Sequence, residues 1–397
     1  MIKAFAYSIV VMMLFVLLEL AVSRALKKKV FEFFDTLCNL ACGILERTFF
    51  LLFAVLYYTS FKFMYDHFGL FSIAINWWSV LLLFVAVDFL WYWYHRAGHE
   101  INILWAAHIT HHQSEEYNLS LSFRVSAIQL IIRMFFWLWL PIIGFDPALT
   151  TLIIGINAAY QFFIHTRLIG KLGFLENILV TPSHHRVHHG KNEQYIDKNY
   201  GGIFIIWDKL FGTFTSEKEE VAYGITKPMS SKNPMKAWFH YYFDLIGAAK
   251  QVVGWKNKLR IMLAGPEVMA SYYDSLAKES TINTQSSGAL KYYLLLQFSL
   301  LFVAFFFVYY YHDVMSKNST IISASFVIYS ALSLGFILDR NRFSFWMEAM
   351  RLLCMSICVF IVLQGLHVQY YMVVAIVPLL LFLPWIGKRK ALFNKIS

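Results

Sequence analysis

The segment WWSVLLLFVAVDFLWYWYHRAGHE, residues 77–100, joins an apolar stretch of membrane-spanning length to a pair of histidines. Asp88 is the only charged residue in it before His95, and about 20 such residues are enough for a helix to cross a bilayer. His95 and His99 are four positions apart, so a helix places both imidazoles on one face, where they can hold one metal ion. The segment therefore predicts a metal site at the end of a membrane span.

The composition of the whole chain is typical of a membrane protein. Of 397 residues, 59% are hydrophobic and only 15% are charged, whereas soluble domains are about one quarter charged. Apolar stretches of spanning length lie at 4–22, 48–64, 77–94, 126–143, 147–165, 291–311, 319–338, 345–364 and 368–386. We therefore expect an all-α fold, a polytopic membrane helical bundle.

The stretches 126–143 and 147–165 have two alternative arrangements. Arg133 lies within the first stretch, and Gly144 and Pro147 lie at the turn between the two. The pair is expected either to cross the membrane as a hairpin or to dip into it from one face.

The basic residues predict the orientation of these helices. Only Lys3 precedes the first stretch, whereas Arg24 and the lysines at 27–29 follow it, which indicates an uncleaved anchor whose C-terminal end lies in the cytosol. On that side the other loops carry Arg47, Arg340, Arg342, Lys388, Arg389, Lys390 and Lys395. The opposite side carries only Lys3, Lys62 and Lys317. The positive-inside rule therefore predicts an external N-terminus, with the C-terminus and the histidines on the cytosolic side.

The net charge of +10 does not predict a nucleic-acid partner. The basic residues lie mainly beside apolar spans and in one central segment, where Lys and Arg commonly face anionic lipid. No nucleic-acid-binding motif accompanies them. We expect a membrane lipid to be the partner, and the sequence does not indicate an oligomeric state.

Composition divides the chain into four regions. They are N-terminal transmembrane helices at 1–75, a histidine-bearing domain at 76–215, a cytosolic or interfacial segment with a linker at 216–290, and a C-terminal transmembrane bundle at 291–397. In the third region, 234–253 mixes aromatic and charged residues and is expected to lie along the membrane surface. Residues 276–289 lack aromatics and are expected to be the linker.

Ten of the fourteen histidines lie between positions 95 and 189. They form three groups, with His165 upstream of the third: His95 and His99; His108, His111 and His112; and His184, His185, His188 and His189. The predicted topology brings all of them to one membrane face. Eight or more neutral imidazoles can surround two metal ions without a carboxylate bridge, so the groups together predict a centre of two metals. Imidazole suits iron, zinc and copper alike, so the spacing does not identify the metal.

Three carboxylates are candidate partners of these rings. Asp88 and His95 lie on the same face of a helix, and we expect Asp88 to accept a hydrogen bond from His95 and so set its tautomer. The alternative is that Asp88 pairs with a neighbouring helix for structure alone. Glu100 and Asp197 lie close to the histidine groups and have the same two alternatives.

Four phrases around these histidines carry a resemblance to a known family. They are DFLWYWYHRAGHE at 88–100, WAAHITHHQSEEYNLSLSFR at 105–124, TPSHHRVHHGKNEQYIDKNYGG at 181–202 and IIWDKLFGTF at 205–214. The stretch from 80 to 215 resembles the fatty acid hydroxylase (sterol desaturase) superfamily, whose members carry H-x-x-x-H, H-x-x-H-H and H-x-x-H-H motifs. Within it, the phrases and the added C-terminal spans look most like the alkylglycerol monooxygenase branch.

The resemblance implies a non-haem di-iron centre that activates dioxygen. Matched to the family's motifs, the metal ligands would be His95, His99, His108, His111, His112, His185, His188 and His189, with His165 a ninth and His184 a group behind them. Glu100 corresponds to an acidic residue that the family needs for activity, and Asp88 and Asp197 are the other catalytic candidates. The branch inserts one oxygen atom at the alkyl carbon next to the ether oxygen of an O-alkylglycerol, and the hemiacetal then collapses to an aldehyde and glycerol. The branch takes its electrons from tetrahydrobiopterin, and no residue of this chain can be assigned to a pterin site.

Other functions also fit the histidine pattern. Hydroxylation or desaturation of a fatty acyl, sterol or carotenoid chain uses the same metal cluster. A non-enzymatic metal carrier would instead place its ligands near the bilayer midplane, and a bis-histidine haem protein would need only two axial ligands. We favour the oxygenase, because the histidines are expected at one membrane interface and are far more than two. The chain has no glycine-rich dinucleotide fingerprint, so we expect the electron donor to be external. The spans around His95 and His165 are expected to form an apolar slot that admits a lipid chain from the bilayer.

Overall fold

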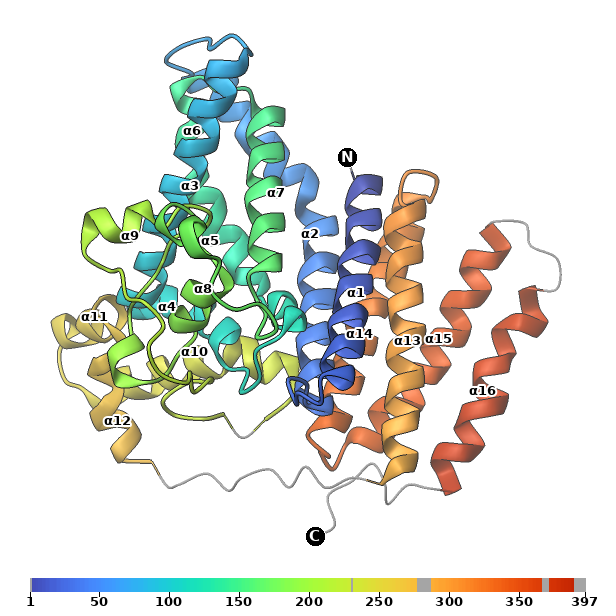
Figure 1. The fold of residues 1–397 in the computed structure, drawn as a ribbon. Helices are drawn as coiled ribbons and strands as arrows, with labels where there is room; N and C mark the ends of the chain where they lie inside the picture. Colours follow the sequence, from blue (N-terminus) through green and yellow to red (C-terminus); the bar gives the residue numbers. More distant parts are fainter. Residues whose placement is uncertain (1, 230, 277–286, 366–370, 389–397) are drawn as a thin grey trace.

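A computed structural model describes residues 2–229, 231–276, 287–365 and 371–388. Helices make up nearly all of its regular structure (Figure 1). No β-strand forms in the part described, where extended pairing is limited to isolated bridges between Leu179 and Phe204 and between Gly190 and Tyr223. The prediction of an all-α fold is confirmed.

Five helices are long and apolar enough to cross a bilayer. They are α1 (Ile2–Ala25), α2 (Phe33–Phe68), α3 (Trp77–Glu100), α13 (Gly288–Tyr311) and α14 (Lys317–Leu338). Two further helices, α15 (Ser344–Gly365) and α16 (Tyr371–Lys388), complete the C-terminal bundle. The first residues of the predicted stretch 368–386 lie outside the described residues. The basic residues at 389–395 also lie outside them. The chain is an integral membrane protein, as its composition predicts.

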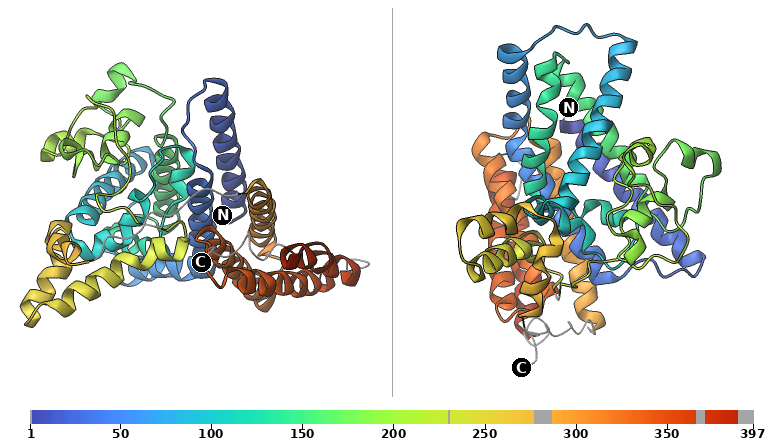
Figure 2. Two further views of the ribbon diagram at one scale, coloured as in Figure 1. Left: turned by 90° about the horizontal axis from the view of Figure 1, so that it is seen from below. Right: turned by 90° about the vertical axis from the view of Figure 1, so that its left-hand side faces the viewer.

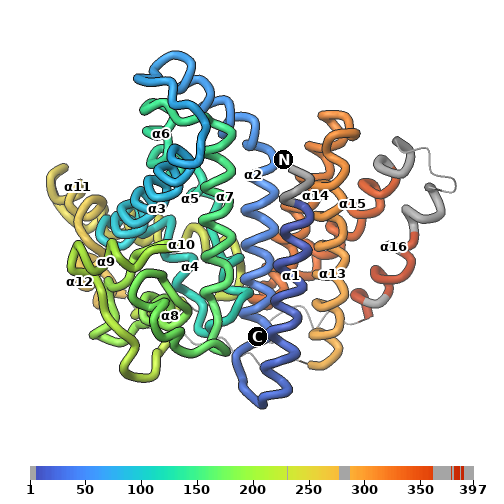
Figure 3. Tube along the Cα trace, turned by 45° about the horizontal axis from the view of Figure 1, so that its top comes forward, coloured from blue at the N-terminus to red at the C-terminus, as the bar shows by residue number. Residues whose placement is uncertain are grey.

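Helix α2 begins well before the apolar stretch predicted at 48–64. Glu32 caps its first turn, because the carboxylate accepts a hydrogen bond from Asp35 N at 2.6 Å. At 1.5 Å per residue its 36 residues extend about 54 Å, more than the hydrocarbon core of about 30 Å requires. Figure 3 shows α2 between the histidine-bearing helices and the C-terminal bundle, so its early part is covered by protein.

The hairpin of α5 (Ala127–Trp137), α6 (Trp139–Ile143) and α7 (Pro147–Phe163) lies beside α2 and α3. Its tip hydrogen-bonds to the α2–α3 connection, with Leu70 N donating to Ile142 O at 2.7 Å and Ile73 N donating to Gly144 O at 3.2 Å. Gly144 has a φ of +118°, and a Cβ there would lie 2.1 Å from Phe71 O, so only glycine fits this turn. Because the hairpin reaches the far ends of two spanning helices, the structure favours the crossing arrangement.

The C-terminal helices α13 to α16 lie apart from the histidine motifs, with α1 and α2 between (Figure 2). Inside this bundle, Arg351 Nη2 lies 2.6 Å from Glu348 Oε1 and donates to Gln297 Oε1 at 2.5 Å. Ser333 Oγ donates to Glu348 Oε2 at 2.9 Å. A buried ion pair is stable in such a place only when hydrogen bonds of this kind satisfy it, and here they join α13, α14 and α15.

Shorter helices gather around the end of α3 that carries the histidines (Figure 1). They are α4 (Asn102–His112), η1 (Leu119–Phe123), η2 (Gly173–Asn177), α8 (Pro182–His188), η3 (Glu193–Tyr195), α9 (Ile206–Phe211), α10 (Pro234–Gln251), α11 (Trp255–Leu263), η4 (Pro266–Met269) and α12 (Ala270–Asp274). Helix α10 occupies most of the segment predicted to lie along the membrane surface. Of the predicted linker at 276–289, residues 277–286 lie outside the described residues, and residues 288 and 289 already belong to α13.

Candidate metal centre

Nine of the predicted metal ligands converge in two buried groups. The first contains His95, His99, His108, His112 and His188, and the second contains His111, His165, His185 and His189. Within each group, one nitrogen of every ring lies within 4.8 Å of the corresponding nitrogens of the others. No ring is more than 8% exposed. Four separate stretches of chain are thus brought together as the topology predicted.

Helices α4 and α8 each contribute to both groups. On α4, His108 and His112 belong to the first group and His111 to the second. The division is reversed at α8. His188 belongs to the first group, whereas His185 and His189, the residue that follows the helix, belong to the second. Side chains four positions apart share a helix face, which explains why the H-x-x-H-H motif divides in this way. The two groups therefore share walls and can hold two ions side by side.

Ring nitrogens in the first group lie at the spacing of neighbouring metal ligands. His95 Nε2 is 3.0 Å from His108 Nε2, which is 3.1 Å from His112 Nε2. Metal–nitrogen bonds of about 2.1 Å place two ligands at right angles about 3.0 Å apart, whereas tetrahedral ligands would be about 3.4 Å apart. Two neutral imidazole lone pairs at this distance repel one another unless a proton or a cation lies between them.

The second group has the same spacing. His165 Nε2 lies 3.1 Å from His111 Nε2 and 3.0 Å from His185 Nε2. In addition, the Nε2 atoms of His99, His188 and His189 are buried without a hydrogen-bond partner among the described residues. A buried polar atom left in this state costs about 1–3 kcal/mol, so these residues fit a bound metal that would accept the lone pairs.

A loop at 197–200 holds three rings of the first group from behind. His95 Nδ1 donates to Tyr200 O at 2.8 Å, and His188 Nδ1 donates to Lys198 O at 2.9 Å. His99 Nδ1 lies 3.5 Å from Asp197 Oδ1. With the proton on Nδ1, each of these rings points its Nε2 lone pair into the group, which is the tautomer that a ligand needs.

Asp88 does not contact His95, so the predicted hydrogen bond between them is wrong. The carboxylate of Asp88 instead faces the continuation of this loop, which runs on to 208 in α9, and it accepts from Ile203 N at 2.7 Å and Phe204 N at 3.0 Å. It also accepts from Trp207 Nε1 at 2.9 Å, and the side chain of Asn157 donates to it at 2.9 Å. The backbone of the loop offers better donors than the ring does, because His95 already donates to Tyr200 O. Asp88 therefore positions the loop, which in turn positions the ring.

Asp208 holds the same loop from a second side. Its carboxylate accepts from Tyr200 N at 2.7 Å, from Gly201 N at 2.8 Å and from Thr213 Oγ1 at 2.6 Å. A Cβ at Gly202 would lie 2.7 Å from Asp88 Oδ1, and a Cβ at Gly201 would lie 2.9 Å from Asp208 Oδ2, so the backbone approaches both carboxylates too closely for a larger residue. Asp88 and Asp208 together therefore fix the shape of the loop.

Besides Asp88 and Asp197, two more predicted site residues lie outside both groups. Glu100 forms an ion pair with Arg96 at 2.9 Å, and its side chain is 44% exposed. His184 is buried, and its Nδ1 lies 3.2 Å from Leu179 O. Neither has a described contact with a ring nitrogen of the two groups.

Gln129 on α5 is a ring partner that the sequence reasoning missed. Its Oε1 lies 3.4 Å from His108 Nδ1 and accepts from Tyr94 Oη at 2.8 Å. Its amide nitrogen donates to Ala107 O at 3.1 Å. The sequence signal that could have identified it is an amide within the apolar stretch 126–143, and the structure shows that this amide is fully buried.

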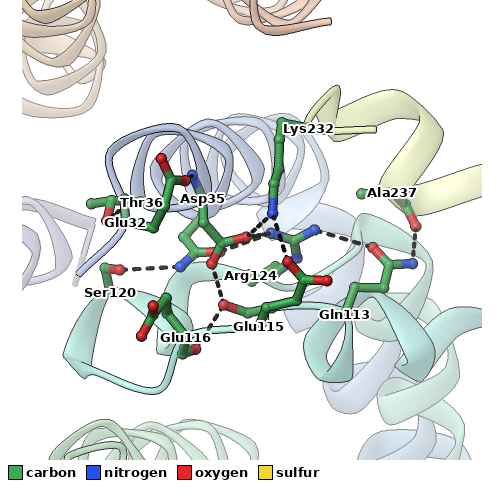
Figure 4. Close-up of polar contacts among 12 residues, drawn as sticks. Glu32, Asp35, Thr36, Gln113, Glu115, Glu116, Ser120, Arg124, Lys232 and Ala237 are labelled. Atoms are coloured by element: carbon green, nitrogen blue, oxygen red, sulfur yellow. Dashed lines mark hydrogen bonds and ion pairs between the residues drawn. The ribbon is translucent and has the colours of Figure 1, made fainter. Parts of the chain in front are cut away.

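Arg124, which follows η1, braces the end of α4 (Figure 4). Its Nε donates to Thr110 O at 3.0 Å, and its Nη2 donates to Gln113 Oε1 at 3.3 Å. Its Nη1 lies 3.3 Å from Asp35 Oδ1 on α2, to which Lys232 Nζ donates at 2.9 Å. The network ties the last turn of α4, with its histidines, to α2 and to the start of α10.

Burial keeps these rings neutral, with a proton on only one nitrogen of each ring. Burial lowers the pKa of six imidazoles well below the ordinary histidine value, and the imidazoles around them lower each pKa further. The six are His108, His111, His112, His185, His188 and His189. The ordinary histidine pKa is about 6.5, so these rings are neutral at pH 7. Neutral imidazole is the form that binds a metal.

Two cavities reach the rings from different sides. The larger, of about 990 Å³, has four of the rings in its lining: His99, His112, His188 and His189. The smaller, of about 70 Å³, contains the other five: His95, His108, His111, His165 and His185. The apolar slot predicted between the spans around His95 and His165 is thus small. The large opening lies on the side of α4, α10 and α12, because the polar segment 190–276 folds back over the rings.

Comparison with known proteins identifies the family. The fatty acid hydroxylase family profile matches residues 80–213, which include both groups of histidines. Human alkylglycerol monooxygenase is 37% identical over 350 residues, 85% of this chain and 78% of the human protein. The chain belongs to the alkylglycerol monooxygenase family. The Xenopus tropicalis alkylglycerol monooxygenase is 34% identical over 349 residues, with the same shares covered.

Similarity to other lipid hydroxylases is confined to part of the chain. An ornithine lipid hydroxylase from Rhizobium tropici is 30% identical over 137 residues, which is 34% of this chain and 41% of that protein. No solved structure matches the chain. The predicted resemblance is confirmed, and similarity to the alkylglycerol monooxygenases covers far more of the chain than similarity to this hydroxylase does.

Proposed function

We propose that this protein is a membrane-bound, dioxygen-dependent di-iron monooxygenase that cleaves O-alkylglycerol ether lipids. One observation carries the proposal: nine buried imidazoles form two adjoining groups beside a cavity of about 990 Å³, in a chain of the alkylglycerol monooxygenase family. Dioxygen supplies one oxygen atom to the alkyl carbon next to the ether oxygen and one to water, using two electrons and two protons. The hemiacetal then collapses to a fatty aldehyde and glycerol.

The nine histidines would hold the two metals, and the bound metals would supply the redox chemistry that activates dioxygen. His95 and His108, like His165 and His185, have nitrogen separations of 3.0 Å, which suit ligands at right angles. Iron accepts such six-coordinate arrangements of imidazole, whereas structural zinc sites are almost always tetrahedral. This spacing supports iron over zinc.

The large cavity suits an amphipathic lipid. Trp105 and Asp197 both line it and both adjoin the ring of His99, Trp105 at 4.9 Å between ring centroids and Asp197 at 3.5 Å from Nδ1. An apolar wall and a polar wall therefore meet at a metal ligand. The ether bond to be oxidised likewise lies between an apolar part, the alkyl chain, and a polar part, the glycerol. Met235 and Phe239 of α10 extend the apolar wall.

The site is proposed to face the cytosol. Arg167, two residues after His165, donates to Lys29 O at 3.4 Å, so the lysine-rich connection after α1 lies on the same side as the rings. Basic connections mark the cytosolic side. Helix α11 exposes Trp255 and Leu259 beside lysines at 256 and 258, a pattern that suits a helix lying on the anionic membrane surface.

The electron donor is proposed to be external, with tetrahydrobiopterin the first candidate. The test uses purified protein in lipid nanodiscs, given iron, air, tetrahydrobiopterin and a chain-labelled O-alkylglycerol. Labelled fatty aldehyde is the expected product, in an amount that depends on iron and dioxygen. Two bound iron equivalents without aldehyde, together with hydroxylation of a fatty acyl lipid, would contradict the proposed substrate but not the metal centre.

A further inference from the structure

The small cavity contains a cation that the proposed chemistry does not use. Arg133 on α5 lines it together with five of the nine rings. Its Nη2 donates to Gln129 Oε1 at 3.0 Å, but its Nε is buried without a hydrogen-bond partner. Among the residues that the structure describes, no carboxylate lies within ion-pair distance of Arg133.

The other arginine of this cavity is neutralised. Arg47 Nε lies 3.2 Å from Glu46 Oε2, so its charge has a partner. Arg133 has no charged partner of this kind among the described residues: it contacts the neutral amide of Gln129, and its Cζ lies 4.9 Å from the Trp91 ring and 5.4 Å from the Tyr94 ring. A ring face attracts a cation but carries no net charge to cancel it. A charge in an apolar helix is costly and usually functional.

The metal centre itself increases the need for negative charge. Every ligand candidate in the two groups is a histidine, which binds metal as a neutral ring. Two divalent ions held there would keep their full charge, and Arg133 adds one more beside them. Among the residues that the structure describes, neither group includes a carboxylate to offset this charge.

We propose that the small cavity binds a small inorganic or carboxylate anion between Arg133 and the metal pair. The cavity of about 70 Å³ is roughly twice the 30 Å³ that one water occupies, so it suits an anion of two to four heavy atoms. The large cavity, lined by the other four rings, remains for the lipid. The two kinds of ligand then reach the metals from different sides. This inference rests on the proposed metal centre.

The test measures anion affinity directly. Ferric-loaded protein is titrated with azide, and the azide-to-iron absorption band gives the dissociation constant. Replacing Arg133 by Gln should weaken azide binding about 10- to 100-fold, since a hydrogen bond between charged groups is lost. The matched control is Lys191→Gln, which removes a cation from the lining of the large cavity and should leave the constant within about twofold. Iron content is measured on every sample.

Two outcomes overturn the inference. If Arg133→Gln binds two irons and has the same azide dissociation constant as the wild type, the anion binds elsewhere. If the wild type fails to bind iron, the proposed metal centre itself is contradicted. A second measurement needs no variant: formate should compete with azide on the wild type, and benzoate should not, because only the large cavity admits it. Equal competition by formate and benzoate would also refute the small cavity as the site.

Discussion

Replacing Asp88 by Asn tests whether the 197–208 loop positions the metal ligands. The carboxylate of Asp88 accepts four hydrogen bonds, from Ile203 N, Phe204 N, Trp207 Nε1 and Asn157 Nδ2. Asparagine keeps one acceptor oxygen and replaces the other with an amide group, so two donors lose their acceptor. At about 1–3 kcal/mol for each, the loop would lose about 2–6 kcal/mol of local stability.

The effect on metal binding follows from what the loop holds. Tyr200 O accepts from His95 and Lys198 O accepts from His188, and both rings belong to the first group. Loss of such a partner typically weakens metal binding about 10- to 100-fold. We therefore expect metal content to fall from two equivalents towards one under competition by a chelator, as the first group releases its ion before the second.

The assay combines chelator titration, metal analysis and thermal unfolding in detergent. The control variant is Asp66→Asn, which removes the same charge from an exposed i, i+4 pair with Lys62 at the far end of α2. Surface pairs contribute about 0–1 kcal/mol, so this variant should keep both metals and its unfolding temperature. Wild-type metal affinity in Asp88→Asn would refute the role of the loop.

Three further predictions test other parts of the site. His184→Ala should keep two metal equivalents whereas His185→Ala should lose metal, as measured by elemental analysis, because only His185 belongs to a group. Acidification below about pH 6.5 should destabilise the folded protein. The rings have lowered pKa values when folded, so only the unfolded chain gains protons in this pH range. The free energy of unfolding should therefore fall by up to about 1.4 kcal/mol per pH unit for each ring. A pH-independent unfolding temperature between pH 7 and 5 would contradict this. Asp35→Asn should lower the free energy of unfolding by about 3–5 kcal/mol, because it leaves Arg124 and Lys232 buried with a weakened partner, and an unchanged denaturation midpoint would exclude it.

The convergence of the histidines could be predicted from their spacing. Helix periodicity and hydropathy depend only on residues close together in the sequence, so both can be read without the tertiary fold. His95 and His99 follow from one helix face, and the shared membrane side of α3 and α7 follows from counting spans. The division of the rings into two groups also follows from i, i+4 pairs such as His108 and His112, although no sequence rule says which group each pair joins.

The partners behind the rings could not be predicted in this way. Asp88 seemed suited to His95 because both lie on one helix face, but the loop 115 residues further along supplies the real donor, Ile203 N. Gln129 and Arg124 likewise act across elements that only the tertiary fold brings together. A polar side chain in an apolar stretch signals that a partner exists, and the identity of that partner depends on packing between distant segments.

The position of the centre follows from electrostatics and matches the proposed substrate. Two divalent ions on neutral rings carry a charge that the bilayer core would penalise strongly, so they are better placed where spans end than halfway along them. The rings lie at the end of α3, next to the exposed carboxylate of Asp197. The glycerol of an ether lipid lies at that same depth, while its alkyl chain extends into the hydrocarbon. In the proposed function, the constraint that keeps the metals out of the bilayer core would therefore place them level with the ether bond of the lipid.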